Sequence, residues 1–336
     1  MNAFSLAIAA ALSLLAGAAG ARTLSVGPGQ EFAVPSLAAR AALDGDVVAI
    51  APGTYYDCSV WRAQRLTIAG TGPGAVLTDT TCQGKAILVL DGDGATIRDL
   101  TLARARVEDR NGAGIRLEAQ GLTLQGVRFI NDEVGLLAGT PGPGRIRITD
   151  CLFEQGGVGA TDGAPATYAI WVGAVALLQI ERTTIRGVKG GAISTAADYS
   201  VLNGNTLSSG TGDGPEAVVQ ASAGGLLMQD NTLTLGPTAP ARAAAVWAAR
   251  NGETILRRNR LLNTTGRPAT LLLDWSRGGA TLDANVLAAG DSDTSSSGLW
   301  RNQAAGVAHG AVDLARGLAG GARHLAGDAK RRLLGP

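Results

Sequence analysis

The sequence predicts an all-β protein, a right-handed parallel β-helix of about ten coils, with a short N-terminal capping helix and a helical C-terminal tail. A phrase of alternating apolar residues recurs along the chain. Glycine accounts for 48 of the 336 residues, aromatic residues for 4% and apolar residues for 46%. This composition suits many short strands and turns. No helix-length apolar pattern interrupts the repeats.

The repeat is clearest at one position of each phrase. Residues 96–102 and 123–129 are two early copies. Later equivalents follow at steps of 22 to 32 residues, and a mean step of about 26 residues indicates a solenoid. The equivalent residues are Leu100, Val127, Cys151, Thr183, Asn205, Asn231, Asn259 and Asn285.

Each coil is expected to hold about three short strands that pair in register with the next coil, about 4.8 Å away. Backbone groups are then satisfied between coils, and an inward stripe of Leu, Ile and Val is buried. The four asparagines at the repeat position predict a buried ladder in which each side-chain amide binds the next.

The first coil is preceded by a pattern typical of a cap. Residues 36–43 read as a short helix stopped by Asp44-Gly45-Asp46, and residues 47–55 then supply an apolar strand and Pro-Gly-Thr-Tyr. This succession resembles the start of bacterial right-handed β-helix proteins of the pectate-lyase-like superfamily. The resemblance covers about residues 34–290. It implies the fold more than an activity, since the scaffold carries lyases, epimerases, hydrolases and binding proteins.

The two ends predict export and an appended tail. Residues 1–21 have the apolar run and small-residue cleavage site of a signal peptide, so a periplasmic or secreted location is expected. An uncleaved alanine-rich anchor is the alternative. The β-helix is expected over 22–290, and residues 291–336 form a linker and tail. The tail repeats apolar residues at helical spacing and is the only segment suited to membrane contact, through Lys330-Arg331-Arg332.

Three cysteines allow one intramolecular disulfide in an oxidising compartment. Cys58 and Cys82 are separated by close to one repeat and are predicted to pair between neighbouring coils. Cys151 occupies the repeat position that Leu100 and Val127 hold in the two preceding copies, and we expect it to be a buried free thiol.

Several functions are excluded by what the sequence lacks. The formal net charge is +1, and the sequence shows no basic face of the kind that binds nucleic acid. No P-loop, G-x-S-x-G or paired C-x-x-C motif occurs. Both histidines, His309 and His324, lie in the tail, so the body has no histidine for general base catalysis or zinc binding.

One outward column of the stack is the candidate polysaccharide-binding surface. Aligning one strand per coil predicts an apolar and aromatic column of Arg116, Leu137, Trp171, Ser194, Val219 and Trp247. Tyr168 and Glu216 lie one alternate position earlier in this alignment, and Glu118 one later. Sugar rings pack on aromatic faces, so Tyr168, Trp171 and Trp247, flanked by Glu118 and Glu216, would bind polysaccharide. The alternative is that the aromatic rings only pack beneath loops or the C-terminal tail.

Catalysis would need a base beside a uronate carboxylate and a group that stabilises the resulting anion. The candidates are Lys189 and Arg116 as catalytic residues, with Asp132 and Glu133 as ligands of calcium. No other cofactor is expected. Asp132 and Glu133 precede a strand two coils before the strand that follows Lys189, about 10 Å away.

The resemblance argues against turnover. In a bacterial subgroup of this superfamily, active members are expected to carry His, Lys and Asp where this chain has Tyr168, Gly191, Ser194 and Gln220. We therefore expect a protein that binds polysaccharide, including uronate-containing chains, with degenerate or absent catalytic groups. The alternatives are a uronate polysaccharide lyase or epimerase, and a structural or adhesive envelope protein.

Overall fold

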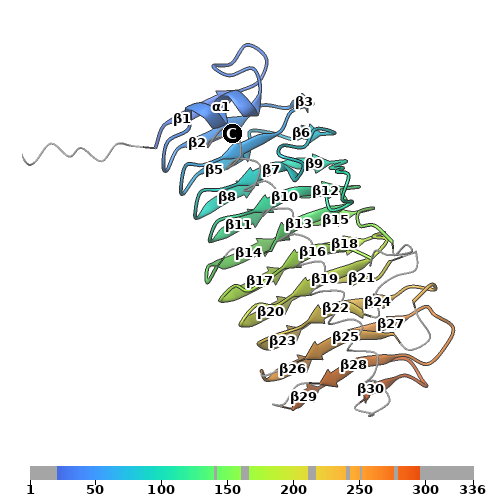
Figure 1. Ribbon diagram of the computed structural model, residues 1–336. Coiled ribbons are helices and arrows are strands. Elements are labelled where there is room, and N and C mark those ends of the chain that lie inside the picture. The colour runs from blue at the N-terminus through green and yellow to red at the C-terminus, as the bar shows by residue number, and fades with distance from the viewer. Residues whose placement is uncertain are drawn as a thin grey trace, which may run out of the picture.

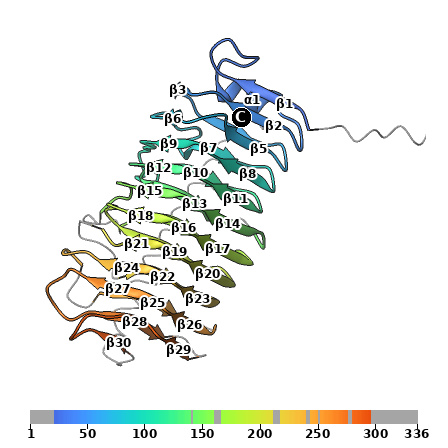
Figure 2. The ribbon, with the colours of Figure 1, turned by 180° about the vertical axis from the view of Figure 1, so that it is seen from behind.

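The protein folds as a right-handed parallel β-helix, as the repeat predicts (Figures 1 and 2). The computed structural model describes residues 21–139, 142–159, 166–210, 217–239, 243–249, 252–275 and 279–295. Three parallel sheets of eleven, ten and nine strands, here named sheets A, C and B, run along the stack. Each of the nine complete coils contributes one strand to sheet A, then one to sheet B, then one to sheet C.

Sheets A and B form two of the three sides. The strands of sheet A are β1 (Thr23–Val26), β2 (Val47–Ile50), β5 (Thr67–Gly70), β8 (Ala95–Arg98), β11 (Leu122–Gln125), β14 (Arg145–Thr149), β17 (Leu177–Glu181), β20 (Tyr199–Asn203), β23 (Gly225–Gln229), β26 (Thr254–Arg257) and β29 (Ala280–Asp283). The strands of sheet B are β3 (Gly53–Tyr55), β6 (Ala75–Thr78), β9 (Thr101–Ala103), β12 (Arg128–Ile130), β15 (Leu152–Glu154), β18 (Thr184–Arg186), β21 (Thr206–Ser208), β24 (Thr232–Leu235) and β27 (Arg260–Asn263).

Sheet C forms the third side and carries the candidate site. Its strands are β4 (Ser59–Trp61), β7 (Ala86–Leu90), β10 (Ala113–Leu117), β13 (Val134–Ala138), β16 (Tyr168–Val172), β19 (Gly191–Thr195), β22 (Ala217–Ala221), β25 (Ala244–Ala249), β28 (Thr270–Trp275) and β30 (Ser292–Ser295).

Parallel pairing keeps equivalent side chains stacked from coil to coil. In sheet C, Leu88, Ile115 and Leu136 are consecutive partners, and all three are fully buried. Phe129 and Phe153 stack in the core with ring centroids 4.4 Å apart. Such columns form the continuous apolar core that the alternating pattern predicts.

The predicted asparagine ladder is present. The side-chain amide of Asn205 donates to Asn231 Oδ1 at 2.9 Å, that of Asn231 to Asn259 Oδ1 at 2.9 Å, and that of Asn259 to Asn285 Oδ1 at 3.1 Å. Each of these amides also donates to a backbone carbonyl of the preceding coil. Thr183 continues the column, because its backbone N–H donates to Asn205 Oδ1. The ladder therefore satisfies buried turns that no strand pairing reaches.

Cys151, earlier in the same column, is the buried free thiol that the repeat predicts. Its thiol donates to the backbone carbonyl of Thr149 at 3.2 Å. Burial raises its pKa to about 12, so the reactive thiolate is scarce at neutral pH.

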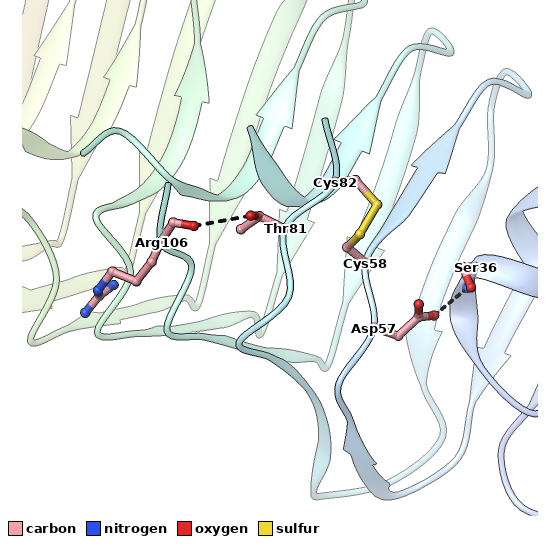
Figure 3. Close-up of a disulfide and its surroundings, with 6 residues drawn as sticks. All are labelled: Ser36, Asp57, Cys58, Thr81, Cys82 and Arg106. Atoms are coloured by element: carbon pink, nitrogen blue, oxygen red, sulfur yellow. Dashed lines mark hydrogen bonds between the residues drawn. A yellow bond between two sulfur atoms is a disulfide. The ribbon is translucent and has the colours of Figure 1, made fainter. Parts of the chain in front are cut away.

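The first coil is closed by helix α1 (Pro35–Ala41), which contacts β1 and β4 and ends two residues before the predicted boundary. Asp57 accepts a hydrogen bond from the backbone N–H of Ser36 at 2.7 Å and so ties α1 to the first coil (Figure 3). The predicted disulfide joins Cys58 to Cys82 on the next coil, with the Cα atoms 5.4 Å apart (Figure 3).

The stack extends further than the sequence indicates. The linker expected from residue 291 contains strand β30, which pairs with β28 and adds a last strand to sheet C. Polar Ser and Asp residues hid this strand, because no apolar alternation marks it. The signal peptide expected at 1–21, apart from its last residue, and the tail from 296 onward lie outside the described residues. Within the part of the chain that the structure describes, no helix is long and apolar enough to cross a membrane.

We predict that Asn231→Ala destabilises the fold by at least about 2 kcal/mol, because buried donors and acceptors on both neighbouring coils lose their partner. The midpoint of urea unfolding checks this. Asn203→Ala, half-buried at the end of β20 on the preceding coil, is the control and should change stability by no more than about 0.5 kcal/mol. Equal losses for the two variants would contradict a structural role for the ladder.

Candidate functional site

The candidate site is the outer face of sheet C, where one outward residue of each strand aligns with the next. From the second strand to the ninth this column is Val89, Arg116, Leu137, Trp171, Ser194, Gln220, Trp247 and Leu273. The predicted column is correct at five of its six positions.

The sixth position is a correction. Val219 was expected to face outward, but it pairs with Ile193 and is fully buried, and Gln220 takes its place between Ser194 and Trp247. Val218 is fully buried as well. Two adjacent valines fit either register, and a shift of one residue moves a side chain to the opposite face.

Tryptophans give the face its aromatic character. Trp171 and Trp247 are both half-buried and lie in the same column, three strands apart, which is about 14 Å along the stack. Trp275, which the sequence reasoning missed, lies on the coil after Trp247, and the two ring centroids are 6.5 Å apart. Trp275 pairs with Ala249, so aligning β28 with β25 would have found it.

Polar groups fill the space between Trp171 and Trp247. The hydroxyl of Tyr168 donates to Gln220 Oε1 at 2.5 Å, across two coils. Ser194, on the strand between them, is 8% exposed and Gln220 is 6% exposed. Tyr168 itself pairs with Gly191. Glu216, the other residue expected at this level, lies outside the described residues. The centre of the face is thus a hydroxyl and amide cluster between two indole rings.

Arg116 and Glu118 lie together, two strands from Trp171. Glu118 Oε1 is 3.2 Å from Arg116 Nε and 2.7 Å from Lys85 Nζ of the preceding coil. Arg116 is half-buried, and its Nε forms an ion pair but no hydrogen bond with Glu118. One carboxylate therefore faces two cations, which leaves an excess positive charge at this end of the face. A guanidinium held in an ion pair is suited to binding an anion rather than removing a proton.

Asp132 and Glu133, the proposed calcium ligands, hold the loop over residues 104–112. Asp132 Oδ1 accepts from the backbone N–H of Ala105 at 2.8 Å. Glu133 Oε2 accepts from the backbone N–H groups of Val107 at 3.0 Å and Gly112 at 2.8 Å. Both carboxylates are buried. Among the described residues, no three acidic, cysteine or histidine side chains gather as a cation would require.

Asp132 is the most perturbed titratable group of this region. Burial raises its pKa well above the ordinary range for a carboxyl group. Its Oδ2 is buried without a hydrogen-bond partner. A neutral carboxylic acid avoids the cost of burying an unpaired charge.

Lys189 lies at the turn before β19 and is exposed. The backbone places it in one column with the acidic turn: Gly157 donates to the carbonyl of Asp132, and Lys189 donates to that of Gly156. The predicted two-coil separation is therefore correct. The side chains differ in setting, since the carboxylates are buried beneath a loop and the ammonium group faces solvent.

Similarity to known proteins is found among solved structures alone. No family model matches the chain, and no curated protein matches it in sequence. A pectin methylesterase from Aspergillus niger is a similar solved structure, with a TM-score of 0.48, 14% identity, and coverage of 83% of this chain and 90% of that one. The pectin methylesterase from carrot gives 0.48 and 12%, covering 84% and 90%. The A-module of a mannuronan C-5 epimerase from Azotobacter vinelandii gives 0.44 and 13%, covering 77% and 92%.

We predict opposite pH dependences for two Asp→Asn variants. The folded pKa of Asp132 is raised above its unfolded value of about 3.9. Its carboxyl group therefore disfavours the folded state increasingly as pH rises through the interval between those two values. Asp132→Asn should thus gain stability relative to the parent as pH rises above about 4.

Asp150→Asn is the control of opposite sign, because the hydrogen bond from Arg182 lowers the pKa of Asp150. The stability that Asp150 contributes is present above its unfolded pKa and is lost as pH falls. The parent should therefore be more stable than Asp150→Asn near neutral pH, and this difference should shrink in acid. Urea unfolding between about pH 3 and pH 8 measures both differences. A pH-independent difference for Asp132→Asn would contradict an unpaired buried carboxyl group.

Proposed function

We propose that the protein is exported and binds polysaccharide along the outer face of sheet C, with little or no turnover. The observation that carries this proposal is the aromatic and polar column: Trp171 and Trp247 flank Ser194 and Gln220 on one line. Indole faces pack on the apolar C–H faces of sugar rings, while hydroxyl and amide groups exchange hydrogen bonds with sugar hydroxyls. The in-register stack repeats such contacts along a chain, as a polymer requires.

An acidic polysaccharide, including a uronate-containing chain, suits the charges at one end of this face. Lys85 and Arg116 exceed the single carboxylate of Glu118, and exposed Lys189 adds a further cation beside β19. Guanidinium and ammonium groups bind carboxylates through charge-assisted hydrogen bonds. Calcium bridging through Asp132 and Glu133 would first require these carboxylates to leave the backbone of the 104–112 loop.

Binding rather than catalysis is favoured by the groups at the centre of the face. Between the two indole rings, the described side chains that align or hydrogen-bond with this column are Ser194, Gln220 and Tyr168. Amides are not general bases, and hydroxyl groups act as such only when another group activates them. The nearest charged pair in the column, Arg116 with Glu118, lies two strands away.

An oxidising compartment is supported by two independent features. The Cys58–Cys82 disulfide joins neighbouring coils, and such bonds persist in the periplasm and outside the cell. Residues 1–21 read as a signal peptide. We therefore place the polysaccharide on the outer side of the cytoplasmic membrane.

Replacing both Trp171 and Trp247 by Ala should remove retention on polysaccharide, lowering affinity at least about tenfold, since each ring contributes on the order of 1 kcal/mol. Affinity electrophoresis through gels containing neutral or uronate polysaccharides measures the effect. The matched control is Tyr56→Ala with Tyr199→Ala, which removes two exposed aromatic rings outside sheet C. Unchanged affinity of the tryptophan variant for a chain that the parent retains would refute the proposed face.

A further inference from the structure

Arg116 carries hydrogen-bond donors that no described residue uses. Its side chain is only 13% exposed, and its Nε is buried without a hydrogen-bond partner. Among the described residues its one polar contact is the ion pair with Glu118, and none of them accepts a hydrogen bond from its guanidinium group. A guanidinium group has five N–H donors, and buried polar groups of proteins nearly always have partners. The donors of Arg116 are therefore available to an acceptor other than these residues.

The side chains of Arg116 and Trp171 lie close together beside Gly139. Arg116 and Trp171 pair with Leu137 from its two sides in sheet C, and Gly139 directly follows β13. The position that a Cβ atom of Gly139 would take is 3.4 Å from Trp171 Cζ3 and 4.0 Å from Arg116 Nη2. A guanidinium group and an indole ring thus border one small space at the end of β13.

The burial of Leu137 shows how the indole ring is held. Leu137 stands in the outward column but is only 3% exposed, and Trp171 packs against the apolar cluster that contains it. Part of the ring therefore lies on this cluster. Trp171 itself is half-buried, so the rest of its ring remains accessible. A ring supported on the sheet in this way offers its open surface to the C–H face of a sugar.

Gly139 keeps the space between the two side chains open. Its φ lies outside the left-handed region that favours glycine, so other residues could adopt the same backbone conformation. A Cβ atom there would make ordinary van der Waals contact with Trp171, and a longer side chain would extend into the space beside Arg116. The glycine therefore leaves room that a larger residue would occupy.

The chemistry of a ligand follows from these two groups. A guanidinium group binds a carboxylate through two parallel N–H···O hydrogen bonds, and an indole ring packs on a sugar ring. Glu118 does not saturate Arg116, because its carboxylate contacts only Nε and is shared with Lys85, whose Nζ is 2.7 Å away. A sugar that bears a carboxylate presents both matching groups in one unit, which neither a neutral sugar nor a small free anion does.

We propose that Arg116, Trp171 and Gly139 form a subsite for a single uronate unit, with the sugar ring on Trp171 and its carboxylate on the Nη groups of Arg116. The subsite rests on the proposed function and deepens it, because it makes Arg116 the residue that distinguishes acidic from neutral chains. The remaining contacts along the column add affinity for both kinds of chain.

Oligogalacturonate and its methyl ester test the specificity by calorimetry, because only the carboxylate differs. The parent should bind the acid at least about tenfold more tightly than the ester. Arg116→Gln should lose most of this preference, and Arg116→Lys should keep only part of it, because an ammonium group lacks the planar fork. Arg128→Gln, which removes an exposed arginine of sheet B without an ion pair to any described residue, is the control of equal charge. A preference that survives Arg116→Gln, or that both Gln variants lose equally, would overturn the subsite.

The space beside Gly139 is tested by filling it. Gly139→Leu should lower the affinity for oligogalacturonate at least about tenfold, as Arg116→Gln does, and Gly139→Ala should lower it less. Gly159→Leu is the matched control, since its φ is also outside the left-handed region and a Cβ atom there meets no atom within 4 Å. The midpoint of urea unfolding verifies that each variant is folded. Unchanged affinity of a folded Gly139→Leu variant would contradict the placement of the ligand.

Monomeric sugars separate this inference from the proposed function. Sodium galacturonate should shift the indole N–H resonance of Trp171 in the parent and not in Arg116→Gln, whereas galactose at the same concentration should shift it less. Such a shift in a protein that retains no polysaccharide would refute the proposed function and leave the subsite standing. Retention of esterified chains as tight as that of acidic chains would refute the subsite and leave the proposed function standing. No shift with galacturonate would overturn the subsite in either case.

Discussion

The structure depends on parallel hydrogen bonding that keeps every coil in register with the next. That register turns a sequence repeat of variable length into straight columns, because insertions leave the stack at the turns while the strands stay paired. The asparagine ladder extends the same principle to a buried turn, where Asn205, Asn231, Asn259 and Asn285 carry hydrogen bonds from coil to coil. The stack is capped at one end by α1 and joined between early coils by the Cys58–Cys82 disulfide.

The candidate site is a consequence of that register. Residues about 26 positions apart in sequence, such as Ser194, Gln220 and Trp247, become neighbours on one line. A linear surface of this kind suits an extended ligand, because each strand adds an equivalent contact.

Much of the fold was predictable, because period-two alternation, a repeat near one coil length and four asparagines each indicate the same stack. The details that failed have local causes. Val218 and Val219 are equally apolar, so only the pairing of β22 reveals that Gln220 faces outward. Strand β30 is polar and is defined by its partner β28 rather than by its composition. Asp132 and Glu133 were chosen as candidate calcium ligands from charge type alone, and nothing in the sequence indicates that both also accept backbone hydrogen bonds from the 104–112 loop.

The central claim is that the outer face of sheet C holds polysaccharide without transforming it. The most direct measurement incubates the mature chain, residues 22–336, with neutral and uronate polysaccharides, with and without calcium, and follows retention, chain mass and sugar composition. The account predicts retained chains with unchanged mass and unchanged composition. Shortened, unsaturated or epimerised chains, or no retention of any polysaccharide, would contradict it.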